Sequence, residues 1–270
     1  MTDTVLPKPI LLIGAGALGS SMLKGFRIRG HVLPADLMIL DLMPGEIAQE
    51  WANDGARLNP QPEEWQKART VILAVKPQGW HAVAQILDGN LAPDAVIVSV
   101  MAGVQAKVLS QGFSGHAVAR VMPTTGVATG RGVASIFAEK PEALAAARGL
   151  FEPMAATVLL KSEDQVDSAT AVSGSGPAYV YAFVRALEKA GKAAGLSSSH
   201  ARDLARGTLV SAARLLDATG EEPDELIRKV ASPGGTTEAA LKVLCKPGEG
   251  LDELVLSAVQ AAHRRAKELG

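Results

Sequence analysis

The apolar positions between residue 9 and about residue 161 form short, nearly continuous runs that alternate with segments of helical periodicity. Strands buried on both faces of a parallel sheet give such runs, because neither face requires polar residues. The sequence predicts strands at 10–14, 37–41, 70–75, 94–100, 117–123, 132–138 and 156–161, and helices around 16–30, 44–54, 79–87 and 141–151. This alternation predicts an α/β domain of the Rossmann type with a doubly wound sheet.

After about residue 162 the strand pattern ends and helical patterns follow, bounded by proline and glycine. Pro177 stands at an expected helix start and Gly220 at an expected helix end. The helix that begins at Pro177 is apolar around most of its circumference, which is typical of a helix central in its domain or covered by a partner subunit. We therefore expect a dinucleotide-binding domain over residues 1–162 and an all-helical domain over residues 163–270.

Composition narrows the class of protein. The 270 residues are 47% hydrophobic and 20% charged, with a net charge of −1, so the chain lacks the basic face that nucleic acid requires. The single cysteine, Cys245, excludes an internal disulfide and favours a reducing compartment. The N-terminal residues do not have the pattern of a secretory signal, and the apolar runs are too short to span a membrane. We expect a cytoplasmic protein that binds neither membrane nor nucleic acid.

The sequence GAGALG follows the first predicted strand and opens the first predicted helix. Gly14 permits a tight turn, Gly16 lets the backbone approach a pyrophosphate, and Gly19 allows close packing of helix on strand. The helix start also supplies free N–H groups and a positive dipole. The alternative is a plain glycine-rich turn, but strand, spacing and helix together favour dinucleotide binding.

Three further positions follow strands at the edge where open α/β sheets bind ligands. Asp41 ends the second predicted strand, where an acid would bind the adenosine ribose of NAD and repel a 2′-phosphate. Lys76 is a candidate for the cofactor's phosphate or ribose oxygens, and Ala102 with Gly103 leaves room for a flat ring. The alternatives are a turn aspartate for Asp41 and an exposed loop lysine for Lys76.

The sequence contains no recognisable acid–base or metal-binding constellation. The five histidines show no catalytic or metal spacing, and the motifs of metalloproteases and serine hydrolases are absent. A protonated C=N bond needs less help from the enzyme than a ketone does, because the iminium already carries the charge that attracts hydride. Such a reduction depends mainly on positioning and electrostatics.

The sequence SPGGTT (232–237) is a candidate for this positioning. Gly234 and Gly235 can adopt positive φ, and Thr236 and Thr237 are expected to open a helix whose free N–H groups attract a carboxylate. The threonine hydroxyls add possible hydrogen bonds, including one to a ring nitrogen. A helix cap without a ligand is the alternative.

With these motifs in view, the chain closely resembles the pyrroline-5-carboxylate reductase family from end to end. The resemblance is carried by IGAGALGSSMLKGF, AVKPQ, SVMAGV, AVSGSGPAY, AGLSSSHARDLARGT and VASPGGTTEAAL, in that order. It implies reduction of 1-pyrroline-5-carboxylate to L-proline with NAD(P)H, the last step of proline biosynthesis. It also implies a helical domain that forms an interleaved homodimer, with higher homo-oligomers common.

The resemblance also assigns site residues. Those it implies for the cofactor are Ile13, Gly14, Ala15, Gly16, Ala17, Leu18, Asp41, Ala74, Val75, Lys76, Pro77, Met101 and Ala102. Those it implies for the substrate are Gly235, Thr236, Thr237 and Glu163, with Thr237 as the catalytic partner of the ring nitrogen. From its sequence position alone, Glu163 is an ordinary surface acid between the two domains. No metal is implied.

Two positions depart from the family pattern. The family usually has Met-Pro-Asn-Thr-Pro where this chain has MPTTG (122–126), so Thr124 replaces an asparagine beside the nicotinamide pocket and Gly126 replaces a proline. Asp41 favours NADH, whereas the family often uses NADPH. Two alternatives stay open: a reductase of a related cyclic imine such as a piperideine carboxylate, and a non-catalytic dinucleotide-sensing protein.

Overall fold

The computed structural model describes residues 6–87 and 89–268 of the chain. The contacts within it divide the chain into two compact units. The first runs as far as Gly174 and includes the segment from Ala262 onward, and the second is Ser175–Ala261. The predicted domain boundary after residue 162 stays a prediction.

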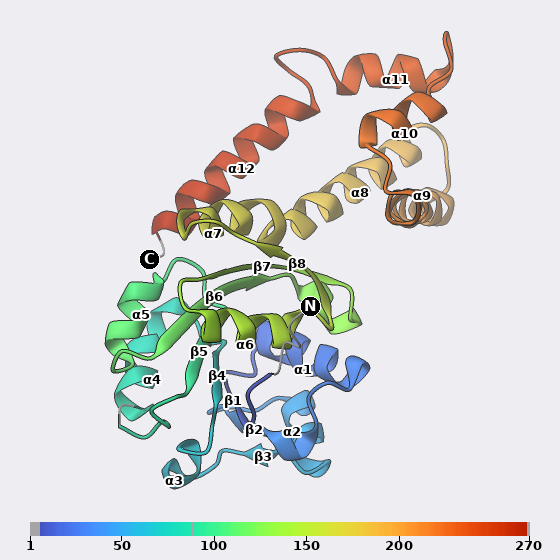
Figure 1. Ribbon diagram of the computed structural model, residues 1–270. Coiled ribbons are helices and arrows are strands. Elements are labelled where there is room, and N and C mark those ends of the chain that lie inside the picture. The colour runs from blue at the N-terminus through green and yellow to red at the C-terminus, as the bar shows by residue number, and fades with distance from the viewer. Residues whose placement is uncertain (1–5, 88, 269–270) are drawn as a thin grey trace. The chain divides into compact units, whose positions relative to one another are not determined.

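The first unit is built on an eight-stranded sheet with the order β3-β2-β1-β4-β5-β6-β7-β8 (Figure 1). The strands are β1 (Ile10–Ile13), β2 (Leu37–Leu40), β3 (Arg57–Leu58), β4 (Thr70–Leu73), β5 (Val96–Ser99), β6 (Ala117–Pro123), β7 (Gly132–Ala138) and β8 (Ala155–Leu159). All seven predicted strands are present, and β6 and β7 have the predicted bounds. Only β3 was not predicted, because two residues are too few to show a pattern.

Helices cover both faces of this sheet. The helices are α1 (Ala17–Arg29), α2 (Glu46–Asn53), α3 (Pro62–Trp65), α4 (Trp80–Leu87), α5 (Ala106–Gly112) and α6 (Pro141–Phe151). Ile10 and Leu12 of β1 belong to one apolar cluster with side chains of α1, α2 and α6. Leu11 and Ile13 point the other way and belong to a second cluster with side chains of α3, α4 and α5. Burial on both faces explains the continuous apolar runs and confirms the doubly wound fold.

The sheet is parallel except for the pair β6 and β7. A parallel return requires a crossover of about a dozen residues or more. The connection between β6 and β7 is shorter and holds a 3-10 helix, η3 (Thr125–Thr129), so β7 runs back beside β6. The segment MPTTG consequently makes its turn at the carboxyl end of β6.

The chain after β8 is helical, as predicted. The elements are α7 (Asp164–Ala169), the π-helix η4 (Thr170–Gly174), α8 (Gly176–Ala193), α9 (Ser198–Thr219), α10 (Pro223–Val230), α11 (Thr236–Leu244) and α12 (Leu251–Glu268). Pro177 lies in the first turn of α8, and Gly220 ends α9 with a left-handed φ of 63°, as expected. No helix in the described residues combines the length and the apolar character that crossing a membrane requires.

The second unit has a very small core of its own. Its buried apolar side chains within the described residues are Val184, Ala201 and Ala205. Its exposed large apolar side chains are Val180, Tyr181, Phe183, Leu187, Leu196, Leu204, Val210, Leu215, Leu216, Ile227, Val230, Val243, Leu244, Leu251, Leu254, Val255 and Leu256. Exposed apolar surface on this scale is typical of a protein–protein interface.

Candidate active site

The glycine loop joins β1 to α1 with three distinct constraints. Gly14 has φ 91°, and a methyl group there would lie 2.7 Å from the carbonyl oxygen of Ala74. A methyl group at Gly19 would overlap the carbonyl oxygen of Gly14, so the start of α1 packs directly on the loop. Gly16 has no atom within 4 Å of its would-be methyl position. The loop is therefore closed toward the sheet and open at Gly16, on the side where a pyrophosphate would approach.

The predicted cofactor segments of the first unit meet at the carboxyl ends of adjacent strands. Gly14 N donates to Leu40 O at 2.9 Å, and Ala74 N donates to Ile13 O at 2.8 Å. Because β1, β2, β4 and β5 are parallel neighbours, the segments 13–18, 74–77 and 101–102 and the residue Asp41 lie along one edge of the sheet (Figure 1). This is the edge at which open α/β sheets bind ligands.

Asp41 is held by the backbone on both sides of it. Its Oδ2 accepts a hydrogen bond from Ala15 N at 2.5 Å, and its Oδ1 accepts one from Met43 N at 2.7 Å. Its own N–H donates to Oδ1 of Asn59 at 2.9 Å. The carboxylate thus braces the glycine loop, a contact that the sequence spacing alone does not reveal.

The other two strand ends contribute mainly backbone. Lys76 is exposed, and no ion pair or hydrogen bond of its side chain occurs within the described residues. The Met101 side chain is buried in the apolar cluster beneath α4 and α5, so this residue presents its main chain at the edge. Ala102 is half-buried and Gly103 has φ 81°.

Glu163 lies at the start of α7, in a buried ionic network rather than free on the surface. Its Oε1 accepts hydrogen bonds from Nη1 of Arg120 at 2.9 Å and from Ala106 N at 2.6 Å. Nη2 of Arg120 reaches Oδ1 of Asp167 at 3.2 Å. Sequence reasoning missed Arg120 and Asp167. The available signal was an arginine in the middle of the apolar run 117–123, where a charge needs a buried partner.

The MPTTG segment is fixed by strand pairing. Thr124 is buried, its N–H donates to Val133 O at 2.8 Å, and its hydroxyl accepts from Val133 N at 3.1 Å. Thr124 therefore joins β6 to β7 with both main chain and side chain. A methyl at Gly126 would lie 3.3 Å from the Thr124 hydroxyl oxygen, so the turn leaves little room for a side chain there.

The predicted substrate residues Gly235, Thr236 and Thr237 belong to the second unit. Thr236 begins α11 as expected, with Gly235 as its N-cap. Of the two glycines, only Gly234 has a positive φ, 71°, whereas Gly235 is extended at −82°. A methyl at Gly235 would collide with the Ser232 side chain, and this contact explains the second glycine without a left-handed backbone.

Sequence reasoning also missed Glu238, at the third position of α11. Its Oε2 accepts from Gly234 N at 2.5 Å, and its Oε1 pairs with Nζ of Lys242 at 3.0 Å. The Gly234 N–H, and after it Lys242, holds the pKa of this carboxyl below its ordinary value. The signal was the acid three residues beyond a cap, a pattern that joins a helix start to its preceding turn. No side-chain hydrogen bond of Thr236 or Thr237 occurs within the described chain, so both hydroxyls are available to a ligand.

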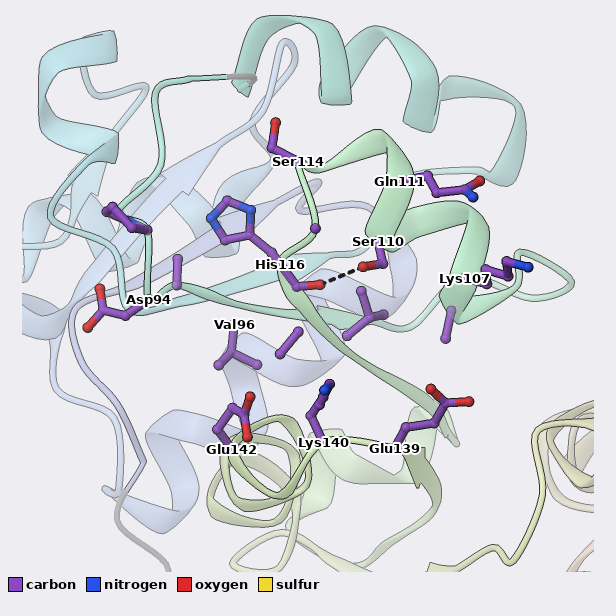
Figure 2. A pocket seen from close by; sticks show the side chains of 16 residues that line it. Asp94, Val96, Lys107, Ser110, Gln111, Ser114, His116, Glu139, Lys140 and Glu142 are labelled. Atoms are coloured by element: carbon purple, nitrogen blue, oxygen red, sulfur yellow. Dashed lines mark hydrogen bonds between the residues drawn. The ribbon is translucent and has the colours of Figure 1, made fainter.

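A cavity of about 690 Å³ lies elsewhere in the first unit (Figure 2). Its lining comes from the amino ends of β5 and β6, from α5 and from the start of α6, and it includes Asp94, His116, Glu139, Lys140 and Glu142. None of the predicted site residues lines it, and it lies at the opposite edge of the sheet from the glycine loop. Cavity size alone therefore does not locate the site. Among the described residues, no group of three or more His, Cys, Asp or Glu could hold a metal ion.

Comparison with known proteins gives the family. Residues 163–269 match the model for pyrroline-5-carboxylate reductase dimerisation, and residues 9–103 match that for coenzyme F420-dependent NADP oxidoreductases. The chain is 37% identical to pyrroline-5-carboxylate reductase from Pseudomonas aeruginosa, covering 96% of each chain. It is 34% identical to the Synechocystis enzyme, covering 96% of this chain and 97% of that one.

A solved structure agrees with these relatives. The pyrroline-5-carboxylate reductase from Coxiella burnetii superposes with a TM-score of 0.88 at 28% identity, covering 97% of this chain and 98% of that chain. The N-terminal match includes the glycine loop, and the C-terminal match to a dimerisation family supports a homo-oligomer. The chain belongs to the pyrroline-5-carboxylate reductase family.

Proposed function

We propose that the chain reduces 1-pyrroline-5-carboxylate to L-proline by transferring hydride from a reduced nicotinamide to the carbon of the C=N bond. The ring nitrogen gains a proton, and the oxidised cofactor leaves. The observation that supports this most directly is the helix start at Thr236 and Thr237, which offers free N–H groups and, within the described part of the chain, hydroxyls without a hydrogen-bond partner. A cyclic iminium carboxylate needs an anion anchor and orientation rather than a proton donor.

For the cofactor end, we propose that the glycine loop holds the pyrophosphate and Asp41 the adenosine ribose. The open position at Gly16 and the N-terminal turn of α1 support the pyrophosphate site. Lys76, exposed and unpaired within the described residues, is proposed for the phosphate or ribose oxygens. The main chain at Ala74–Pro77 and at Met101 and Ala102 would border the nicotinamide half.

The choice of cofactor is proposed to be NADH. A 2′-phosphate placed beside Asp41 would meet a carboxylate whose hydrogen-bond partners in the structure are two backbone N–H groups, with no cation in an ion pair to it among the described residues. Like charges at short range disfavour binding by several kcal/mol where they are desolvated, about 1 kcal/mol or more even near a surface. Asp41 therefore discriminates against NADPH.

For the substrate end, we propose that the N–H groups of Thr236 and Thr237, which follow the N-cap Gly235, bind the carboxylate and that the Thr237 hydroxyl bonds to the ring nitrogen. Glu163 is proposed as a further substrate-binding residue. The helical unit is proposed to form the homodimer, because its apolar side chains are exposed in the single chain. The reaction is placed in the cytoplasm, where a chain with one cysteine stays reduced.

The test compares two imines and two cofactors in steady-state assays. We expect the highest kcat/KM for pyrroline-5-carboxylate with NADH. Because the MPTTG turn departs from the family pattern, a six-membered piperideine carboxylate is the second candidate substrate. A higher kcat/KM for that imine would reassign the substrate. Cofactor binding with no turnover of either imine would leave the dinucleotide sensor as the function.

A further inference from the structure

We infer that Arg120 is a positioning residue for Glu163, which is proposed above to bind the substrate, so the inference rests on that proposed function. Its side chain is only 2% exposed in the middle of β6. Its guanidinium donates to Glu163 at 2.9 Å and to Asp167 at 3.2 Å. A buried charge is stable only when it is paired and hydrogen-bonded, so these contacts are obligatory. Arg120 thereby fixes the start of α7 on the sheet.

The same network reaches the nicotinamide side of the proposed site. Oε1 of Glu163 also accepts from Ala106 N at 2.6 Å, and Ala106 is the first residue of α5. The preceding residues include Met101 and Ala102, which are proposed to border the cofactor. One carboxylate oxygen therefore joins three segments, β6, α5 and α7, that are far apart in the sequence.

Arg120 also determines which oxygen Glu163 leaves free. Oε1 is occupied by two donors, whereas no hydrogen bond to Oε2 occurs within the described residues, and the side chain is 24% exposed. Two hydrogen bonds, one from Nη1 of Arg120 and one from Ala106 N, hold Oε1 against β6 and the start of α5. Glu163 is thus held with Oε2 available to a ligand, and Arg120 acts through Glu163 rather than by touching the substrate.

A second contact, on the same face of β6, supports the π-helix that follows α7. Met122 lies two residues beyond Arg120, on the same side of the strand. A methyl at Gly174 would lie 3.4 Å from the Met122 sulfur, so the π-helix Thr170–Gly174 rests on Met122. Turns of π-helix are rare and are frequent at functional sites. Arg120 and Met122 together hold the chain from Glu163 to Gly174, where the first unit gives way to the second.

The test is the variant Arg120→Lys. Lysine keeps the charge, but one ammonium group cannot reproduce the planar fork that binds two carboxylates. We expect the KM for pyrroline-5-carboxylate to rise about tenfold, as for loss of one charge-assisted hydrogen bond, while the KM for NADH stays within about twofold. Arg148→Lys is the matched control, because Arg148 pairs with Glu152 on the exposed face of α6. We expect no change in either KM for the control.

A rise in the KM for the imine without a rise in the KM for NADH distinguishes a positioning role of Arg120 from a purely structural role. Equal rises in both KM values, or no change in either, would overturn the assignment. If Arg120→Lys does not yield folded protein, Asp167→Asn and Glu163→Gln take its place, because each removes one charge and keeps the side-chain shape. We expect both to raise the KM for the imine selectively, and two variants with wild-type kinetics would overturn the assignment. An inactive wild type would contradict the proposed function itself.

Discussion

At the scale of single residues, two carboxylates each join segments that are distant in the sequence. Asp41, just after the second strand, accepts the Ala15 N–H of the glycine loop. In the same way, the family pattern singles out Glu163, but Arg120 joins it from 43 positions away. Long-range pairs of this kind depend on how strands and helices pack, so no local pattern contains them.

Replacing Asp41 should change the choice of cofactor. In Asp41→Ser the negative charge beside the proposed ribose site is lost, and a short hydroxyl is left to bind the 2′-phosphate. We expect the ratio of kcat/KM for NADPH over NADH to rise by about tenfold, equivalent to about 1.4 kcal/mol. Both KM values should also rise somewhat, because the brace to Ala15 is lost.

Asp54→Ser is the matched control for this change. Asp54 is exposed at the end of α2 and pairs with Arg27, away from the glycine loop. The substitution Asp54→Ser also removes one negative charge from this part of the chain, and it should leave the ratio of kcat/KM for NADPH over NADH unchanged. An unchanged ratio in Asp41→Ser as well would remove Asp41 from the ribose site.

Replacing Thr237 should affect the imine and not the cofactor. Thr237→Ala removes the hydroxyl proposed for the ring nitrogen while keeping a good helix residue. We expect kcat/KM for the imine to fall about tenfold or more, as for a hydrogen bond to a charged group, with the KM for NADH unchanged. Thr219→Ala, at the last position of α9, is the control. Wild-type kinetics in Thr237→Ala would exclude Thr237 from the substrate site.

At the scale of elements, long segments with a strong periodic pattern were predicted correctly from the sequence, whereas short helices were not predicted. The buried strands and the long helices were predicted because many residues repeat the same preference. The four-residue α3 and the seven-residue α5 were not predicted, since they span only one or two turns. The glycine turn before α11 was predicted as a helix start, but its detailed φ values depend on Ser232 and Glu238, which pack against it.

The contact between α1 and η3 is one element pair that can be tested. Gly25 lies within α1, and a methyl there would overlap the carbonyl oxygen of Val127 and lie 2.7 Å from the Met154 sulfur. We expect Gly25→Ala to reduce the free energy of unfolding by about 2 kcal/mol, because overpacking outweighs the gain in helix propensity. Urea unfolding measures this. Gly79→Ala, with no atom within 4 Å, should change it by less than about 0.5 kcal/mol. Equal stability of the two variants would contradict the close contact.

The turn before α11 should depend on pH through Glu238. The folded turn lowers the pKa of this carboxyl from its ordinary value of 4.5, mainly through the Gly234 N–H. Its contribution to stability is therefore complete above pH 4.5 and is lost as the pH falls through the lowered value. We expect wild type to unfold at a higher urea concentration than Glu238→Gln at pH 6, and the difference to shrink at pH 3. A difference that does not vary with pH would contradict the contact between Glu238 and Gly234.

At the scale of the whole molecule, the two units differ in how many of their large apolar side chains are buried in the single chain. The first has two apolar clusters, one on each face of its sheet. The second leaves many large apolar side chains exposed, although its helices are well formed. The apolar circumference of the helix from Pro177 raised two possibilities, burial within the domain or in a partner. Exposure in the single chain favours the partner and agrees with the dimerisation family that this segment matches.

The most direct measurement follows NADH oxidation and L-proline formation together, with the full-length protein and 1-pyrroline-5-carboxylate. We expect one L-proline to form for each NADH consumed, because one hydride and one proton convert the C=N bond to an amine. Omission of either the imine or the cofactor should abolish both signals. Consumption of NADH without L-proline, or no consumption at all with properly folded protein, would contradict the proposed reaction.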